Sequence, residues 1–379
     1  MINYDLYLPS MLDLLKRLVE TESPSHDTSA VNNVGAIIGE EVKSMGGKIE
    51  IIHNETSGNH IIARFDPPLS PGKATHEKGF LLLSHMDTVF PVGTLTHMPF
   101  NEKDGRILGP GVSDMKAGAV IGLTALIALL ENKKMPLVPI TALFTSDEEA
   151  GSHTSRKWIE KLAKDAQLVL VLEPGMPDGS IKTWRKGVGD FHIVVHGQAA
   201  HSGGNHENGR NAIEELSHHV LAIQGLTDYS RGTTLNVGVI QGGIVVNVVP
   251  EKAWMDVDLR VMQPGEAERI MEAIYNLKPV LQGTSLEISG NLNRPPMPYG
   301  ELMQSTFEHA REIAAEDGIT LTAAGTGGAS DGNFVAPLGI PVLDGLGAIG
   351  GDYHSEKEYI IKDSLVSRTR LLATLLQNW

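Results

Sequence analysis

Five short groups of His, Asp and Glu, separated by long stretches of chain, contain the residues of this sequence that could do chemistry. Most of them directly follow an apolar, strand-like run and precede Gly, Pro or other small residues, which is where loops leave the edge of a sheet in α/β proteins. So many carboxylates beside two imidazoles would repel one another, and a divalent metal would relieve that repulsion while enabling hydrolysis. The groups are Ser84-His85-Met86-Asp87, Ser113-Asp114-Met115-Lys116, Asp147-Glu148-Glu149, Glu173-Pro174-Gly175 and Tyr353-His354-Ser355-Glu356.

Three of these groups each allow a metal-binding and a structural interpretation. On an extended backbone Asp87 would point the same way as His85 and could accept its second ring N–H, orienting the imidazole for a metal; the alternative is a surface histidine. The carboxylate of Asp114 could instead cap the helix that follows it. Glu148 and Glu149 are adjacent, so one could bind a metal while the other faces a water, or both could belong to a solvated acidic loop.

The other two groups are equally open when taken singly. Glu173 follows five apolar residues, and a carboxylate so close to a buried strand needs a partner. His354 lies in a Gly-rich loop and could be structural. The joint occurrence of all five groups favours the metal interpretation.

The composition limits the class of protein. A chain of 379 residues predicts roughly two domains, and 41% hydrophobic with 20% charged residues is typical of a soluble protein. The net charge of −15 argues against a nucleic-acid partner. Because there is no Cys, any metal must be held by His and carboxylates. We see no signal peptide and no apolar run long enough to span a membrane, so we expect no membrane partner and a cytoplasmic location.

The first half of the chain alternates between strand and helix patterns. This alternation predicts an α/β fold with a mostly parallel sheet sandwiched by helices. Helices are expected at 6–21, 31–45 and 117–130, and strands at 49–53, 61–65, 80–83, 139–145 and 168–172.

The pattern changes near residue 183. The order strand, helix, strands, helix, strand predicts an inserted α+β, ferredoxin-like domain with an antiparallel sheet. We therefore expect a discontinuous first domain at 1–184 and 294–379, and an inserted second domain at 185–293. Within the insert, strands are expected at 191–196, 233–240, 243–249, 253–261 and 286–289, and helices at 212–226 and 263–277.

In this order, the five groups resemble those of the M20 family of metallopeptidases, and most closely its glutamate carboxypeptidase branch. The resemblance covers essentially the whole chain, because the insert adds two further family motifs. The residues that carry it are Ser84-His85-Met86-Asp87-Thr88-Val89, Gly111-Val112-Ser113-Asp114-Met115-Lys116, Ser146-Asp147-Glu148-Glu149-Ala150-Gly151-Ser152, Glu173-Pro174, His354-Ser355, Ala200-His201-Ser202-Gly203 and Asn247-Val248-Val249-Pro250.

The resemblance implies two Zn²⁺ per subunit, with Co²⁺ or Mn²⁺ as substitutes, and a set of site residues. Asp114 would bridge both ions, and a cis peptide is expected between Asp114 and Met115. His85 and Glu173 would complete the ligands of one ion, and Glu149 and His354 those of the other. Glu148 would be the general base, with Asp87 as a further catalytic residue. Each ion would keep an open position for water or substrate, as catalytic zinc does.

The resemblance also implies that the discontinuous domain at 1–184 and 294–379 is a zinc exopeptidase-like catalytic domain and that the insert at 185–293 is a lid and dimerisation domain. The insert would have functional residues of its own. His201 matches a lid histidine that reaches the active site of the partner subunit and stabilises the oxyanion, which implies a homodimer through the lid domain; the alternative is an exposed loop histidine. Asn247 and Arg260 match positions that grip the substrate's carboxylate, and Arg suits such a clamp. Arg294 could bind a second acidic group of the substrate; the alternative is a surface Arg. Thr326 and Gly327 match a loop that lines the pocket.

The implied activity is hydrolysis of an amide that releases a C-terminal amino acid, with glutamate as a candidate, from a small peptide or an N-acyl amino acid. Two alternatives keep the same fold: an N-acyl amino acid deacylase or desuccinylase, and a non-catalytic metal-binding scaffold.

A third alternative is a serine hydrolase that uses Ser330. The segment 328–332 fits the G-x-S-x-G pattern, with Asp344 or Asp352 and then His354 downstream in hydrolase order. This reading leaves four of the acidic and histidine groups unexplained. The residues of the preceding segment, 322–327, are also too small and too rich in Gly to form the buried strand that such a nucleophile needs.

Overall fold

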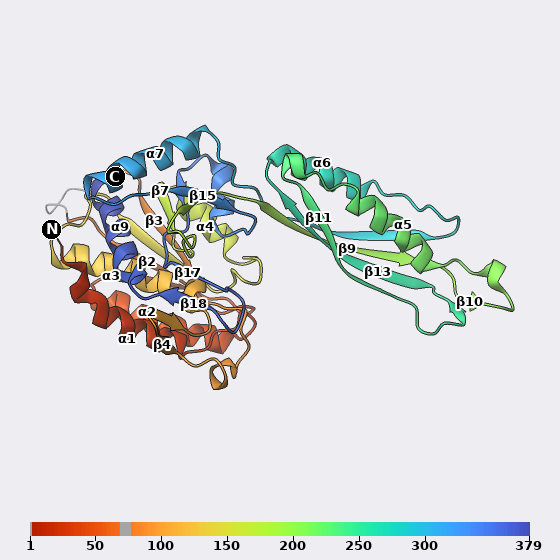
Figure 1. Cartoon of the computed structure of the whole chain (residues 1–379), viewed down its shortest axis with the longest axis horizontal. Coiled ribbons are helices and arrows are strands. Elements are labelled where there is room, and N and C mark those ends of the chain that lie inside the picture. The colour runs from red at the N-terminus through yellow and green to blue at the C-terminus, as the bar shows by residue number, and fades with distance from the viewer. Residues whose placement is uncertain (1, 69–76) are drawn as a thin grey trace. The chain divides into compact units, whose positions relative to one another are not determined.

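The chain forms two compact units in the computed structural model, which describes residues 2–68 and 77–379 (Figure 1). Unit 1 comprises Met1–Trp184, Tyr299–Gly325 and Ser330–Trp379, and unit 2 comprises Arg185–Pro298 and Thr326–Ala329. Segments 294–298 and 326–329 therefore cluster with unit 2, whereas the sequence-based boundaries placed them with the catalytic part. The catalytic and lid roles of the two units stay a prediction.

Unit 1 is built on a six-stranded sheet with helices packed against it. The strand order is β1-β2-β6-β3-β7-β16. Strands β6, β3, β7 and β16 pair in parallel, whereas β2 pairs antiparallel with both β6 and the edge strand β1. The expected mostly parallel sheet is confirmed. The strands are β1 (Lys48–Ile52), β2 (His60–Phe65), β3 (Gly79–His85), β6 (Ile140–Thr145), β7 (Ala166–Val171) and β16 (Val342–Leu343).

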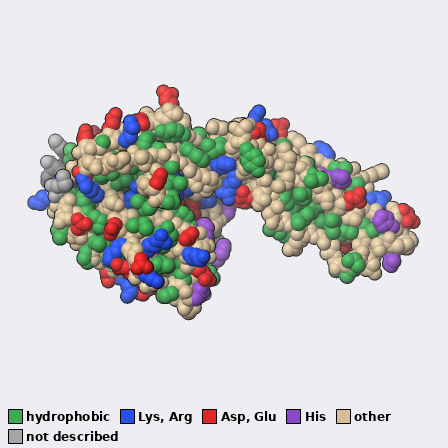
Figure 2. Space-filling model, in the orientation of Figure 1, with side chains coloured by type: hydrophobic (Ala, Val, Ile, Leu, Met, Phe, Trp, Pro, Cys, Tyr) green, Lys and Arg blue, Asp and Glu red, His purple; other side chains and the backbone are tan. Residues whose placement is uncertain are grey.

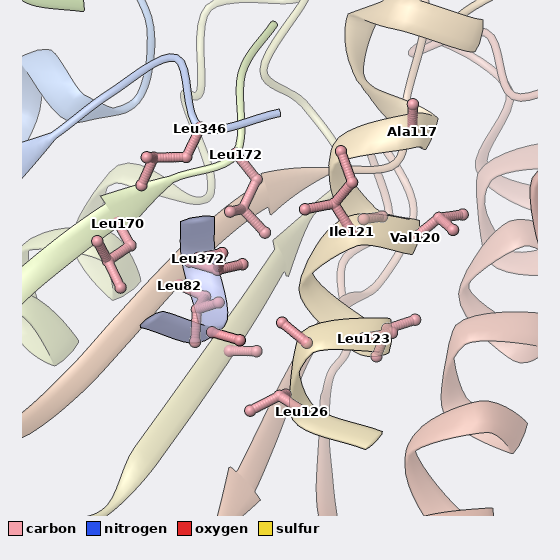
Figure 3. Packing of buried hydrophobic residues seen from close by; sticks show 14 of the residues in the cluster. Leu82, Ala117, Val120, Ile121, Leu123, Leu126, Leu170, Leu172, Leu346 and Leu372 are labelled. Atoms are coloured by element: carbon pink, nitrogen blue, oxygen red, sulfur yellow. The ribbon is translucent and has the colours of Figure 1, made fainter. Parts of the chain in front are cut away.

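Helix α3 (Ala117–Glu131) lies at the centre of the core of unit 1. Figure 3 shows Ile121 and Leu126 on the side of α3 that faces Leu82 of β3 and Leu372 of α9 (Ser364–Asn378). Each such side chain stabilises the fold by roughly 1.5–3 kcal/mol when it is fully buried. The other helices of unit 1 are α1 (Leu8–Val19), α2 (Thr28–Ser44), α4 (Arg156–Ala163), α7 (Glu301–Glu316) and α8 (Gly332–Val335).

The expectation of no membrane-length apolar run needs a correction. Among the described residues, one segment, Val112–Glu131, is long and apolar enough to cross a membrane by length and composition alone. It consists of α3 and the irregular residues that precede it. However, 89% of its most apolar window is buried inside the protein, which is typical of a core helix. Over the face of unit 1 seen in Figure 2, acidic and basic side chains are interspersed.

A second, four-stranded sheet brings distant segments of unit 1 together. Its order is β17-β18-β5-β4, formed by β17 (Gly350–Gly351), β18 (Tyr359–Ile361), β5 (Arg106–Leu108) and β4 (Asn101–Lys103). Because β18 pairs with β5, the segment that carries His354 lies beside the one that leads to Asp114. A short pair, β8 (Ile181–Arg185) and β15 (Ala323–Thr326), completes the strands of this part of the chain.

Unit 2 has an antiparallel sheet with two helices packed on one face, as the sequence predicts. The strand order is β11-β13-β9-β14, from β9 (Gly187–His196), β11 (Thr234–Gly242), β13 (Lys252–Val261) and β14 (Ser285–Arg294). Side chains of α5 (Ala212–Gln224) and α6 (Pro264–Tyr275) share a buried core with alternate residues of these strands (Figure 1).

The strand expected at 243–249 is wrong for most of its length. Only β12 (Val248–Val249) forms, paired with β10 (Ala200–His201). Gly243 takes a positive φ of 73°, and Ile244 and Val246 are 94% and 103% exposed. The apolar composition of this segment predicted burial in a sheet, but no neighbouring strand covers it within the described part of unit 2.

Candidate metal centre

Three parallel strands end side by side at one edge of the unit 1 sheet. Strand β3 lies between β6 and β7, and in its register His85 stands opposite Thr145 while Leu83 stands opposite Val171. Because the carboxyl ends of parallel strands meet at the same edge, the residues that follow them converge. His85 ends β3, Glu148 and Glu149 follow β6, and Glu173 follows β7.

Asp114 lies at the centre of the cluster, between the two histidines. Its Oδ1 is 3.1 Å from His85 Nε2 and its Oδ2 is 3.4 Å from His354 Nε2. Glu173 Oε1 lies 3.6 Å from His85 Nε2, and Glu149 Oε2 lies 3.3 Å from His354 Nε2. All five residues proposed as metal ligands therefore meet in unit 1.

Glu148 belongs to the same cluster. Ligand atoms of His85, Glu148 and Glu173 lie within 4.8 Å of one another, as do those of His85, Asp114 and Glu149. Either group offers the nitrogen and oxygen donors that zinc accepts.

Asp87 organises this cluster differently from the sequence-based expectation. The ring Nδ1 of His85 lies 2.9 Å from the main-chain carbonyl of Asp87, closer than the 3.5 Å to its carboxylate Oδ1. The buried carboxylate instead accepts hydrogen bonds from the main-chain N–H groups of Glu148 (3.2 Å) and Glu149 (3.1 Å). Asp87 thus positions His85 and the following two glutamates at once, and His85 Nε2 is left facing Asp114.

Ser25 is a supporting residue that sequence reasoning missed. Its hydroxyl donates a 2.7 Å hydrogen bond to Asp87 Oδ2. It stands in the turn between α1 and α2, 62 residues before Asp87, and no feature of its own sequence neighbourhood points to that contact.

The capping interpretation of Asp114 is wrong. The helix that follows has Lys116 at its N-cap, with no side-chain hydrogen bond to cap it. Asp114 itself is non-helical (φ −111°, ψ 92°), and the peptide bond to Met115 is cis, as the resemblance implied. Gly111 precedes it with φ 67°, a conformation that favours glycine.

Glu358 holds this irregular segment and was also missed from the sequence. Its buried carboxylate accepts hydrogen bonds from the main-chain N–H groups of Gly111, Ser113 and Asp114. Burial raises the pKa of Glu358 to about 7. One signal was available: Glu358 directly precedes the apolar run of β18, and a carboxylate in that position needs a partner, as argued for Glu173.

The negative charge of the clustered carboxylates favours a cation at this site. Hydrogen bonds to Asp114 and Glu149 raise the pKa of His354 to about 11. Although burial of the ring opposes charge, hydrogen bonds with Asp114, Asp87 and Glu173 raise the pKa of His85 well above 6.5. Burial raises the pKa of the Glu149 carboxyl. The carboxylates therefore hold positive charge nearby, either as protons on the histidines or as a metal in their place.

A buried oxygen provides the test of fit to a metal. Glu149 Oε1 is buried and has no hydrogen-bond partner among the described residues, although its other oxygen faces His354. A buried carboxylate oxygen is costly unless it is paired or binds a cation. Together with the two histidine Nε2 atoms and Asp114, this oxygen makes the residues present fit divalent metal.

Three of the proposed substrate-binding residues meet in unit 2. Arg260 extends from the face of β13 opposite the buried core, and its Nη1 lies 3.5 Å from the carbonyl of Gly327. The same guanidinium forms a fork with Asp258, with Nε to Oδ1 at 2.9 Å and Nη2 to Oδ2 at 2.8 Å. The hydroxyl of Thr326 accepts from the N–H of Gly328 at 3.2 Å.

His201 and Asn247 lie together on another part of unit 2. The pairing of β10 with β12 places His201 opposite Val248, and the N–H of Ser202 donates to the carbonyl of Asn247. His201 is exposed, and its Nδ1 accepts from the N–H groups of Gly203 and Gly204, both at 3.1 Å.

Arg294 is not a surface residue, so that alternative is wrong. It is 7% exposed, and its Nη1 donates to the side chain of Asn293 at 3.2 Å.

The serine-hydrolase alternative is also wrong. Ser330 is fully buried, and its hydroxyl donates a 2.6 Å hydrogen bond to Asp344 Oδ2 while accepting one from the N–H of Gly332. The histidine that would have to activate it, His354, faces Asp114 and Glu149 instead. A hydroxyl that is buried and committed to a carboxylate cannot attack a substrate.

Comparison with known proteins places the cluster in a family context. The sequence profile of peptidase family M20/M25/M40 matches residues 81–378. Carboxypeptidase G2 of Pseudomonas sp. (strain RS-16) is 29% identical to this chain over 375 residues, which cover 98% of this chain and 89% of the relative. Succinyl-diaminopimelate desuccinylase of Verminephrobacter eiseniae (strain EF01-2) is 26% identical over 333 residues, covering 82% and 81%.

A solved structure has the same fold. Bacillus subtilis YXEP, a dinuclear metal binding peptidase from the M20 family, superposes with a TM-score of 0.68 at 17% identity, covering 98% of both chains.

Proposed function

We propose that this chain, which belongs to peptidase family M20/M25/M40, is a dinuclear zinc-dependent amide hydrolase. The proposed reaction releases a C-terminal amino acid from a peptide or an N-acyl amino acid. Membership of the family makes the chain a hydrolase of the metallopeptidase and amidohydrolase type, so a non-catalytic scaffold is not retained. The number and identity of the metal ions and the substrate are the parts that we propose.

The observation that carries the proposal is that the two oxygens of one carboxylate face two different histidines. Asp114 turns one oxygen toward His85 and the other toward His354. Glu173 lies on the side of His85, and Glu149 on the side of His354. This arrangement supports two ions that share Asp114, each held by one further histidine and one further glutamate. The relative YXEP binds a dinuclear metal with the same fold.

Glu148 is the candidate general base. Its main-chain N–H is held by Asp87, and its carboxylate lies in the group with His85 and Glu173. Two bound zinc ions would polarise the amide carbonyl and lower the pKa of the attacking water. Glu148 would take a proton from that water and pass it to the leaving amine, which conserves the proton over the reaction. Asp87 would keep both His85 and Glu148 in place during this transfer.

Substrate binding is assigned to unit 2. A guanidinium binds a carboxylate strongly through paired N–H donors, and Arg260 lies beside Gly327 and Thr326, so we assign it to the carboxylate of the released amino acid. Asn247 and Arg294 complete the proposed set. The carboxypeptidase relative makes release of a C-terminal amino acid the first candidate to test, with glutamate as the amino acid that the sequence resemblance implies. The desuccinylase relative keeps N-succinyl substrates as the second candidate.

A homodimer through unit 2 is part of the proposal, because His201 would act in the active site of the partner subunit, where its ring would stabilise the oxyanion. The exposed edge strand β11 supports it: Val239 and Ile240 are 44% and 53% exposed, and the exposed Ile244 and Val246 follow directly. Unpaired strand edges with apolar side chains favour pairing with another chain. The cytoplasmic location stays a prediction.

The experiment that tests the proposal combines metal removal with one substitution. Hydrolysis of a panel of dipeptides and N-acyl amino acids is measured with zinc, with cobalt and after complete chelation, for the unchanged protein and for Glu148→Gln. We expect chelation to abolish turnover. The substitution should lower kcat by about 10²–10⁴-fold while two zinc ions per chain remain bound. Turnover that survives chelation would exclude the metal mechanism, and normal turnover in Glu148→Gln would exclude this base.

A further inference from the structure

Glu358 is a buried carboxylate that spans two segments of the candidate metal centre without being one of its ligands. It is fully buried in unit 1, and it belongs to neither ligand group found among the described residues. Its Oε1 accepts from the N–H groups of Ser113 (2.8 Å) and Asp114 (3.0 Å), and its Oε2 accepts from that of Gly111 (3.3 Å). One side chain thus binds three amides of a four-residue segment.

That segment needs an external acceptor because of its own conformation. Gly111 has φ 67°, and Asp114 and Met115 lie outside helical φ and ψ, so the N–H groups of Ser113 and Asp114 are not donors in the hydrogen-bond ladder of α3. Ser113 is fully buried. Buried N–H groups without acceptors are strongly unfavourable, and the side-chain oxygens of Glu358 supply the acceptors here.

Glu358 also belongs to the segment that carries the second histidine. It stands four residues after His354, directly before β18, and its N–H donates to the carbonyl of Ser355 at 3.1 Å. The two segments are packed without spare room, because a Cβ added to Gly350 would come within 2.7 Å of Ser113 Oγ. A carboxylate at this junction therefore ties the main chain of Asp114 to the loop of His354.

We infer that Glu358 is a positioning residue that sets the spacing between Asp114 and His354, and through it the metal affinity of the centre. The inference rests on the proposed function, since it presupposes that these two residues bind metal. Side chains that orient ligands without touching the metal typically contribute about 10–100-fold to metal affinity or activity.

The test is Glu358→Gln, which keeps the size of the side chain and one acceptor oxygen. The other oxygen becomes an NH₂ group that cannot accept, so the segment loses either the bond to Gly111 or the pair to Ser113 and Asp114. Zinc affinity is measured by competition with a chelator. The visible absorption spectrum of the Co²⁺-substituted protein reports ligand geometry independently of turnover. We expect affinity to fall by about 10–100-fold and the spectrum to change.

The matched control is Glu215→Gln in unit 2. Glu215 is also a fully buried glutamate, and it accepts from the N–H groups of Val280 (2.8 Å) and Leu281 (2.6 Å), far from any proposed ligand in sequence. Glu215→Gln also replaces one acceptor oxygen with an NH₂ group. This variant therefore reports the effect of losing a buried acceptor in general. We expect it to leave zinc affinity and the cobalt spectrum as in the unchanged protein.

The outcomes separate this inference from the proposed function. If the unchanged protein binds no zinc, the proposed function fails and this inference with it. If it binds two ions and Glu358→Gln binds them with the same affinity and spectrum, only the role of Glu358 is overturned. Should Glu358→Gln not fold, the same titration on Glu358→Asp decides: weakened binding supports the inference, and unchanged binding overturns it.

Discussion

Gly118 provides a sharp test of how the core positions the candidate centre. It lies in the first turn of α3, four residues after Asp114, and a Cβ built on it would lie 2.0 Å from the carbonyl oxygen of Leu172. Leu172 directly precedes Glu173, and Figure 3 shows it against the start of α3. At Gly118 the nearest atom across this contact is a main-chain oxygen, which cannot rotate away as a side chain can.

The magnitude of Gly118→Ala follows from that contact. Carbon and carbonyl oxygen atoms approach no closer than about 3.3 Å, so helix and strand end must separate by roughly 1 Å. The helix gains about 1 kcal/mol of intrinsic propensity from Ala, but overpacking of this kind costs about 1–3 kcal/mol. With rigid main chain on the other side we expect the upper end, a net loss of about 2 kcal/mol in the free energy of unfolding. Moving Asp114 relative to Glu173 by about 1 Å should also lower kcat/KM by about 100-fold.

Two glycines serve as controls in urea unfolding and in the activity assay. A Cβ on Gly122, one turn later in α3, would meet Leu172 Cδ1 at 2.6 Å, a side-chain atom that can rotate, so Gly122→Ala should cost less. A Cβ on Gly39 in α2 would make an ordinary 3.6 Å contact with Ile49, so Gly39→Ala should stabilise by about 0.5–1 kcal/mol. If Gly118→Ala were as stable and as active as Gly39→Ala, the close approach and the reasoning from it would be refuted.

Three further predictions concern other parts of the chain. Ser330→Ala removes the buried hydrogen bond to Asp344, so the free energy of unfolding should fall by about 1–3 kcal/mol while kcat is retained; loss of kcat in folded protein would revive the serine mechanism. Arg260→Ala should raise KM for substrates with a free C-terminal carboxylate but not for their amides, and an equal rise for both would contradict the clamp. Hydrogen bonds from Arg269 and Arg231 lower the pKa of Glu266 from 4.5 to about 2, so its charged form stabilises unit 2 above pH 4.5 and this contribution is lost as the pH falls through about 2. Glu266→Gln should therefore be less stable by about 1–2 kcal/mol at neutral pH, with the difference shrinking below pH 4.5, and a difference independent of pH would contradict the shifted pKa.

Local sequence was sufficient for most of the elements and for the groups of candidate ligands, whereas the full ligand set followed from the family resemblance. The run before His85 and that before Glu173 are apolar enough to predict buried strands, and parallel strands carry the residues that follow them to one edge of the sheet. The alternation along β13 likewise predicts a sheet with one buried face. These inferences depend only on periodicity and residue type, which are local properties.

Local patterns failed where the environment decides. The apolar segment 243–249 reads as a strand, but strand formation needs a neighbour to pair with, and only Val248–Val249 finds one. Taken alone, Asp114 is typical of a helix cap, but its carboxylate lies between His85 and His354. In both cases the deciding contact comes from a distant part of the chain.

The sequence by itself determined which side chains could bind a metal, because ligand chemistry belongs to residue type and the strand ends that present it follow from local apolar runs. Only the tertiary structure decided how those side chains are held. Ser25 reaches Asp87 across 62 residues, and Glu358 reaches Gly111 across 247. Such contacts form because buried amides and carboxylates must find partners wherever the fold brings them together, and no periodicity records where that is.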